Sequence, residues 1–323
     1  INLLSSFGQS PQLSWAKGIL GGDTLSINIS FATESDKWGN VYTVGYFART
    51  SDFDPGPLSY SLTSSGWFDG YILKLDSNGN FIWAKKINCT NGDGITDIAI
   101  NDNGDLFLTG YFTGIADFDL GTGTYTLNTG ANMADPFVLK LDSGGNFKWV
   151  KHFYGPGGGD GGKSIALDKA GNIYVGGDFN GIVDFDPGIN VFNLSPSSNY
   201  KDFFILKLDS LGDFVWANKI GGKFDDYCSK LIVDSNNNCF ISGFFSDTVD
   251  FNPGISSFNV SSNGNQDIFL LKLASNGNFL WVKNIGGIGN DFASDFRIDK
   301  SSNIIITGQF DYTIDFDPSS SVY

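Results

Sequence analysis

Acidic residues paired around a phenylalanine are the side chains of this sequence that are best placed to do chemistry. Residues 184–188, Asp-Phe-Asp-Pro-Gly, show the motif in full, and it recurs along the chain. Side chains alternate along an extended segment, so both carboxylates face one side and the phenylalanine faces the other. Paired carboxylates could bind Ca²⁺, which takes about 6–8 oxygen ligands, or line a binding surface for a polar ligand such as a glycan. The candidate binding residues are Asp52, Asp54, Asp117, Asp119, Asp184, Asp186, Asp250, Asn252, Asp315 and Asp317.

A turn explains the same motif without any ligand. An aspartate at the start of a turn accepts hydrogen bonds from backbone amides, proline fixes φ, and glycine accepts a positive φ. Leu120 in place of the proline and Asn252 in place of the second acid are both compatible with a turn. As a metal ligand, Asn252 would keep an oxygen but lower the charge of the site. The turn is the favoured interpretation, and calcium is the one cofactor left open.

The sequence offers few other residues that could form a catalytic site. The chain has one histidine, His152, and its three cysteines lack metal-ligand spacing, which disfavours the usual zinc sites and a Ser-His-Asp triad. Residues 157–164 fit the letters of a phosphate-binding P-loop, but they lead into a short apolar segment instead of the helix that such a loop needs. Carboxylates could support glycoside hydrolysis. A carbohydrate-active enzyme is therefore an alternative, although a catalytic acid pair should break the repeat that these acids follow.

Two periodic residues reveal the elements that must position these acids. Tryptophan recurs every 65–68 residues and glycine every 65–67 residues, which predicts successive copies of one structural unit. The periodic residues are Trp15, Trp83, Trp149, Trp216 and Trp281, and Gly45, Gly110, Gly177, Gly243 and Gly308. We expect a leader or the remnant of a signal peptide at 1–12. The repeats then cover 15–82, 83–148, 149–215, 216–280 and a truncated 281–323.

Each copy has the pattern of four short strands. In the third copy, residues 164–168, 173–179, 202–208 and 214–220 are rich in β-branched and aromatic residues and are bounded by Gly, Asn and Asp turns. Strands that are apolar on both faces need neighbours on both sides, which favours the stacked four-stranded blades of an all-β propeller. The acidic motif falls between the second and third strands, so we expect an added hairpin in every blade.

Strand order predicts where the acidic hairpins lie. Successive antiparallel strands alternate in direction, so the hairpin and the link to the next blade should share one side of the disc. The carboxylates would then surround one mouth of the propeller. In the first copy, Thr-Glu-Ser-Asp at 33–36 replaces an apolar segment, so an innermost strand is not expected there. The last copy stops before its third strand, which predicts a fragment of a longer propeller and not a closed five-bladed ring.

Residues 165–177, 202–212 and 281–287 show a recurring pattern, with Ile-Ala-Leu-Asp at 165–168 and Trp-Val-Lys-Asn-Ile-Gly-Gly at 281–287. The pattern resembles the bacterial seven-bladed β-propeller repeat family, often called SBBP, and it covers nearly the whole chain. The resemblance implies a propeller fold and a secreted or surface-attached bacterial protein. It implies no particular activity.

Composition and charge narrow the function further. The chain has 35 acidic against 20 basic residues, a net charge of −15, and such a surface repels nucleic acid. It has no apolar run long enough for membrane insertion. We therefore expect a secreted or cell-surface binding or scaffolding module with a protein or a glycan as partner. The alternatives are a carbohydrate-active enzyme and a purely structural spacer.

Overall fold

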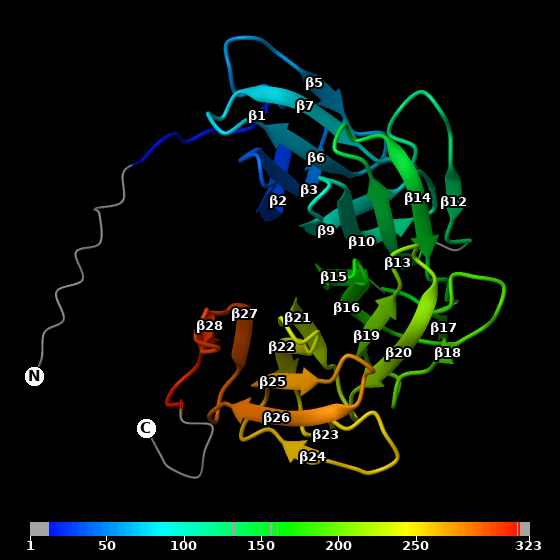
Figure 1. The fold of residues 1–323 in the computed structure, drawn as a ribbon, viewed down its shortest axis with the longest axis vertical. Coiled ribbons are helices and arrows are strands. Elements are labelled where there is room, and N and C mark those ends of the chain that lie inside the picture. Colours follow the sequence, from blue (N-terminus) through cyan, green and yellow to red (C-terminus); the bar gives the residue numbers. More distant parts are fainter. Residues whose placement is uncertain (1–12, 131–132, 156, 160, 315, 317–323) are drawn as a thin grey trace, which may run out of the picture.

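The computed structural model describes residues 13–130, 133–155, 157–159, 161–314 and 316, and all regular elements among them are β-strands. Figure 1 shows the sheets fanning out in an arc around a common axis, as the blades of a β-propeller do. The predicted all-β propeller class is therefore confirmed. This part of the chain has no helix that could cross a membrane. The leader predicted at 1–12 lies outside the described residues.

Four sheets have four strands each, and their strands follow sequence order from the axis outwards. Blade 1 contains β2 (Ile27–Ser35), β3 (Val41–Ala48), β6 (Asp69–Leu75) and β7 (Phe81–Lys86). Blade 2 contains β9 (Gly92–Ile100), β10 (Leu106–Thr113), β13 (Ala134–Leu141) and β14 (Phe147–His152). Blade 3 contains β15 (Gly161–Leu167), β16 (Ile173–Phe179), β19 (Asp202–Leu208) and β20 (Phe214–Ile220). Blade 4 contains β21 (Tyr227–Val233), β22 (Cys239–Phe245), β25 (Asp267–Leu273) and β26 (Phe279–Ile285). A fifth, two-stranded sheet contains β27 (Asp291–Ile298) and β28 (Ile304–Phe310).

Four periodic tryptophans lie on the outermost strands of the blades, whereas Trp15 lies outside any strand; the four are Trp83, Trp149, Trp216 and Trp281. Trp216 in β20 donates its indole Nε1–H to the carbonyl of Ser275, 3.2 Å away in a turn of blade 4. Trp15 makes the corresponding bond to the carbonyl of Ser77 in blade 1, at 3.1 Å. The tryptophan period therefore records packing between blades.

The periodic glycines are explained by a β-bulge between the innermost strand and its neighbour in the four blades and in the fifth, two-stranded sheet. At each bulge the pairing register shifts by one residue, as between Cys228 and Lys230 opposite β22. A Cβ on Gly243 would lie 1.9 Å from the carbonyl oxygen of Tyr227, which is backbone and cannot rotate away. The other periodic glycines meet the facing carbonyl oxygen at 1.8–2.2 Å. Only glycine fits beside the bulge.

We expect Gly243→Ala to lower the free energy of unfolding by about 1–3 kcal/mol or more, because the clash forces a backbone shift. Urea unfolding followed by circular dichroism measures this loss. Gly18→Ala is the matched control, since a Cβ at Gly18 has no atom within 4 Å. Equal stability of the two variants would contradict this explanation of the glycine period.

The expectation that the first copy lacks an innermost strand is wrong. β2 pairs with β3 along its whole length, from Ile27 opposite Ala48 to Ser35 opposite Val41. The hydrogen bonds to β3 override the weak strand propensity of residues 33–36. Most side chains of β2 are exposed, so polar residues can occupy this strand without being buried against another blade.

A short added hairpin follows the second strand of each four-stranded blade, as predicted. The hairpins are β4 (Thr50–Asp52) with β5 (Ser61–Thr63), β11 (Ile115–Asp117) with β12 (Thr126–Asn128), β17 (Val183–Asp184) with β18 (Asn193–Leu194), and β23 (Thr248–Asp250) with β24 (Asn259–Ser261). They pair with the link from the preceding outer strand, as β11 does with β8 (Asn88–Cys89) and β4 with β1 (Leu20–Gly21). Hairpin and link therefore share one side of the disc.

The hairpins nevertheless lie at the rim, outside the outer strands (Figure 1). The expectation that their carboxylates surround the central mouth is wrong. Phe192 in the third hairpin packs on Phe214 of the outer strand β20, with ring centroids 4.8 Å apart. Tyr60, Tyr125 and Phe258 make the same contact in the other blades. These contacts direct the hairpins outwards.

Candidate functional site

The acidic hairpin residues are organised as capped turns. Asp184 Oδ1 accepts hydrogen bonds from the backbone amides of Asp186 at 3.1 Å and Phe192 at 2.8 Å. Asp186 Oδ1 accepts one from the Gly188 amide at 2.8 Å. The same bonds form at Asp52 with Asp54, Asp117 with Asp119, and Asp250 with Asn252. Asn252 can replace an acid because the turn needs only an acceptor oxygen.

The part of the chain that the structure describes does not assemble a metal centre. None of its His, Cys, Asp and Glu side chains form a group of three or more that could hold an ion. Each described motif contributes only two acidic or amide side chains, and each of these gives one oxygen to a backbone amide. Asp315 and Asp317, the remaining candidates, lie outside the described residues. Binding at the hairpin acids stays a prediction.

We expect the melting temperature of the protein to be the same in calcium chloride and in EDTA, because two carboxylates fall far short of the ligand number that calcium prefers. Differential scanning calorimetry at fixed ionic strength measures it, with magnesium chloride as the control for nonspecific screening of the acidic surface. A rise of several degrees with calcium alone would show that the hairpins bind the ion.

A second set of carboxylates lies buried between the blades, where the sequence pattern did not place them. Seven aspartates of this set are fully buried. Four lie at the first or second position of a third strand, namely Asp69, Asp135, Asp202 and Asp267. Three lie in or just before an innermost strand, namely Asp93, Asp226 and Asp291. Each third-strand aspartate contacts an outer-strand residue 17 positions later. These contacts are Lys86 to Asp69 at 2.5 Å, His152 to Asp135 at 2.6 Å, Lys219 to Asp202 at 3.3 Å and Asn284 to Asp267 at 2.9 Å. The lone histidine therefore takes a repeat position held elsewhere by lysine or asparagine.

Burial disfavours the ionised form of several of these carboxylates and raises their pKa values. Burial, and then the charge of Asp69, raises the pKa of Asp93 well above its usual value. Burial raises the pKa of Asp226 to about 7, against the hydrogen bonds that it accepts from the Ser246 and Gly222 amides. Burial also raises the pKa of Asp267, and the charge of Asp291 adds to the effect. The set holds blades together and makes stability depend on pH.

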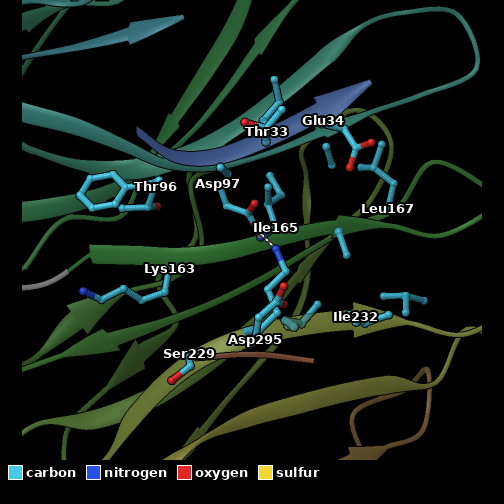
Figure 2. A pocket seen from close by; sticks show the side chains of 18 of the residues that line it. Thr33, Glu34, Thr96, Asp97, Lys163, Ile165, Leu167, Ser229, Ile232 and Asp295 are labelled. Carbon is cyan, nitrogen blue, oxygen red and sulfur yellow. Dashed lines mark hydrogen bonds and ion pairs between the residues drawn. The ribbon is translucent and has the colours of Figure 1, made fainter. Parts of the chain in front are cut away.

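A polar cavity lies in the central channel, between the innermost strands of the blades. The cavity has a volume of about 680 Å³ and is lined by the innermost strands β2, β9, β15, β21 and β27. Figure 2 shows Thr96, Lys163 and Ser229 at one end and Glu34, Leu167 and Ile232 at the other, with Asp97 between them. The charged residues of the lining are Glu34, Asp97, Lys163, Lys230, Asp295 and Arg297.

Three adjacent blades meet at one carboxylate in this channel. Asp97 Oδ2 accepts hydrogen bonds from Ser164 Oγ at 2.7 Å, from the Ile165 amide at 3.0 Å and from Lys230 Nζ at 2.8 Å. Ser164 Oγ in turn accepts the Leu231 amide at 3.1 Å. The hydroxyl is fully buried and both of its hydrogen-bonding roles are occupied, so this Ser-Lys-Asp group is a structural tie and not a nucleophile with its base.

The P-loop-like stretch has no P-loop structure. Gly161, Lys163 and Ser164 lie in or next to the bulge of strand β15, and no helix follows. Lys163 instead reaches the channel. Asp160 lies outside the described residues.

Comparisons with known proteins support a β-propeller-like repeat. No family model matches the chain. An uncharacterized WD repeat-containing protein of Acanthamoeba polyphaga mimivirus is 24% identical over 378 aligned positions, which cover 96% of this chain. The regulatory protein FlaEY of Caulobacter vibrioides is 28% identical over 176 positions, 53% of this chain. The chain spans only 27% and 18% of the lengths of these relatives.

A crystal structure of a protein of unknown function from Bacteroides caccae aligns with 79% of this chain and 81% of its own, with a TM-score of 0.35 and 10% identity. WD repeats form propeller blades, so the mimivirus relative agrees with the sheets described above. The chain is thus similar to β-propeller repeat proteins.

Proposed function

We propose that this chain is a binding module of the β-propeller type, secreted or displayed on a cell surface, which engages a protein or a glycan at its central channel. Membership of the SBBP-type repeat family, implied by the sequence pattern, belongs to the same proposal. The strongest support is that side chains at the rim repeat from blade to blade, whereas side chains facing the axis differ between blades. The rim repeats the same turns and packing residues in every blade, whereas the inner strands present different charged side chains to one cavity.

A repeated position serves structure in each copy, whereas a position that differs between copies is free to serve one ligand. At the third residue after the bulge, the five sheets place Glu34, Ala99, Ala166, Ile232 and Arg297, all of which line the channel. A cavity of this size falls within the about 300–1,000 Å³ typical of ligand sites. A propeller with a charged, partly open axis therefore suits recognition better than a spacer role.

Charge reversal in the channel tests this proposal. The immobilised chain is screened against surface proteins and against an array of neutral and acidic oligosaccharides. We expect a ligand whose binding weakens at least tenfold in Arg297→Glu or Glu34→Lys, since both residues line the channel. Lys148→Glu, on the outer strand β14, is the matched control and should bind as the unchanged chain does. A ligand that responds only to Lys148→Glu would place recognition at the rim and contradict the proposal.

A further inference from the structure

The mouth of the central channel, on the side from which the hairpins leave, is bordered by aromatic rings. Neighbouring rings are 4.8–6.5 Å apart between centroids, and they follow one another around the opening from blade to blade. They are Phe31, Tyr46, Phe68, Tyr111, Tyr227, Phe244 and Phe292. Phe31 is exposed and the other six are half-buried, so each ring keeps part of its surface open to solvent.

Blade 3 interrupts this aromatic border. The residue after the periodic glycine is aromatic in blades 1, 2 and 4 (Tyr46, Tyr111 and Phe244) but is Asp178 in blade 3. Its partner across the strand pair is Gly161, where blade 4 has Tyr227. The gap lies in a second cavity of about 680 Å³ that is also lined by Lys163, Tyr111 and Tyr227.

The carboxylate of Asp178 lies in this gap, and one of its two oxygens accepts no hydrogen bond from the described residues. Asp178 is buried, and its Oδ1 accepts the Cys228 amide at 2.9 Å. Its Oδ2 has no hydrogen-bond partner among the described residues. The ammonium of Lys163 forms an ion pair with this same Oδ2 at 3.6 Å, beyond hydrogen-bond distance, and the Lys163 side chain is 43% exposed. A buried carboxylate oxygen without a donor is costly, so a ligand hydroxyl that donates to it gains affinity.

We propose that this gap binds a neutral sugar residue, which rests on the proposed role of the chain as a binding module. A sugar ring has apolar C–H faces that fit against Tyr111 and Tyr227, and hydroxyls that can donate to Asp178 and accept from Lys163. The lysine balances the charge of the carboxylate, which removes the preference for a cationic ligand. The net charge of −15 disfavours phosphates and acidic sugars.

The substitutions Asp178→Asn and Tyr111→Ala test the site. In an array of neutral and acidic oligosaccharides we expect neutral members to bind, and calorimetry with the best of them should show about a tenfold or greater loss of affinity in each variant, as for the loss of a hydrogen bond to a charged group. Lys163→Gln serves as a second variant, and circular dichroism checks that each variant is folded, because Lys163 is the counter-ion of the buried Asp178. Gln309→Ala is the matched control, since Gln309 follows the periodic glycine of β28, outside this cavity.

The outcomes separate the two proposals. Neutral-glycan binding that is unchanged in Asp178→Asn, Tyr111→Ala and Lys163→Gln would overturn the sugar site and leave the binding module intact. The same holds if only a protein or an acidic glycan binds and its affinity responds to Arg297→Glu. If no ligand of either class responds to any channel variant, both proposals fail.

Discussion

Replacing Phe185 with alanine is expected to destabilise the protein by about 3–5 kcal/mol, the usual loss for a buried phenylalanine. Phe185 is the central residue of the third acidic motif and is fully buried. Its ring lies 4.7 Å from that of Phe204 and 5.6 Å from that of Phe179. The phenylalanine thus fastens the hairpin to the second and third strands of its blade. The variant would lose the apolar transfer energy and leave a cavity among rings that cannot close it.

Urea unfolding at constant pH measures this loss, with the slope of the transition checking that the denatured state is unchanged. Ile189→Ala is the matched control, because Ile189 lies in the same hairpin and is completely exposed. We expect the control to change stability by less than about 0.5 kcal/mol. A loss of less than about 1 kcal/mol in Phe185→Ala would mean that the hairpin is not part of the cooperative fold.

The sequence predicted the blades because their packing residues recur at fixed intervals. Trp216 bonds a turn of the next blade and Gly243 lies beside a bulge, and both residue types recur at the same position in successive copies. Alternation along the chain also predicted that the motif acids face one way. Capping at Asp184 and burial of Phe185 follow from that pattern.

Radial position and contacts across blades could not be predicted in this way. The position of the third hairpin at the rim depends on the packing of Phe192 against Phe214, a tertiary contact that no local pattern encodes. Asp97 and Lys230 are 133 residues apart, and the one-residue shift at each bulge obscures that they hold the same repeat position. The buried carboxylates did leave a signal, namely the constant spacing of 17 residues between Asp69 and Lys86, or Asp202 and Lys219. The spacing can be interpreted as an ion pair only after the structure shows that these aspartates are buried.

The stability of this protein is expected to fall as the pH rises from about 4 to above 7. Burial raises the pKa of Asp226 from 3.8 to about 7 in the folded state, so the folded protein holds this proton more tightly than the unfolded chain does. The contribution of Asp226 is fully present below the unfolded pKa and is lost as the pH passes through the folded pKa. A shift of this size corresponds to at most about 4 kcal/mol. Asp93, Asp135, Asp178 and Asp267 have pKa values shifted in the same direction.

The test compares the pH dependence of unfolding free energy in the unchanged chain and in Asp226→Asn, by urea titrations between pH 5 and about pH 8. The amide does not titrate, so the variant should lose part of the downward slope, although it gives up one of the two backbone bonds that Asp226 accepts from Gly222 and Ser246. Asp213→Asn, at a side chain that is 69% exposed, removes the same charge from the surface and should keep the slope. Parallel curves for the unchanged chain and Asp226→Asn would show that Asp226 is ionised in the folded protein at these pH values. The inter-blade carboxylates would then act as fixed charges and not as a proton-binding set.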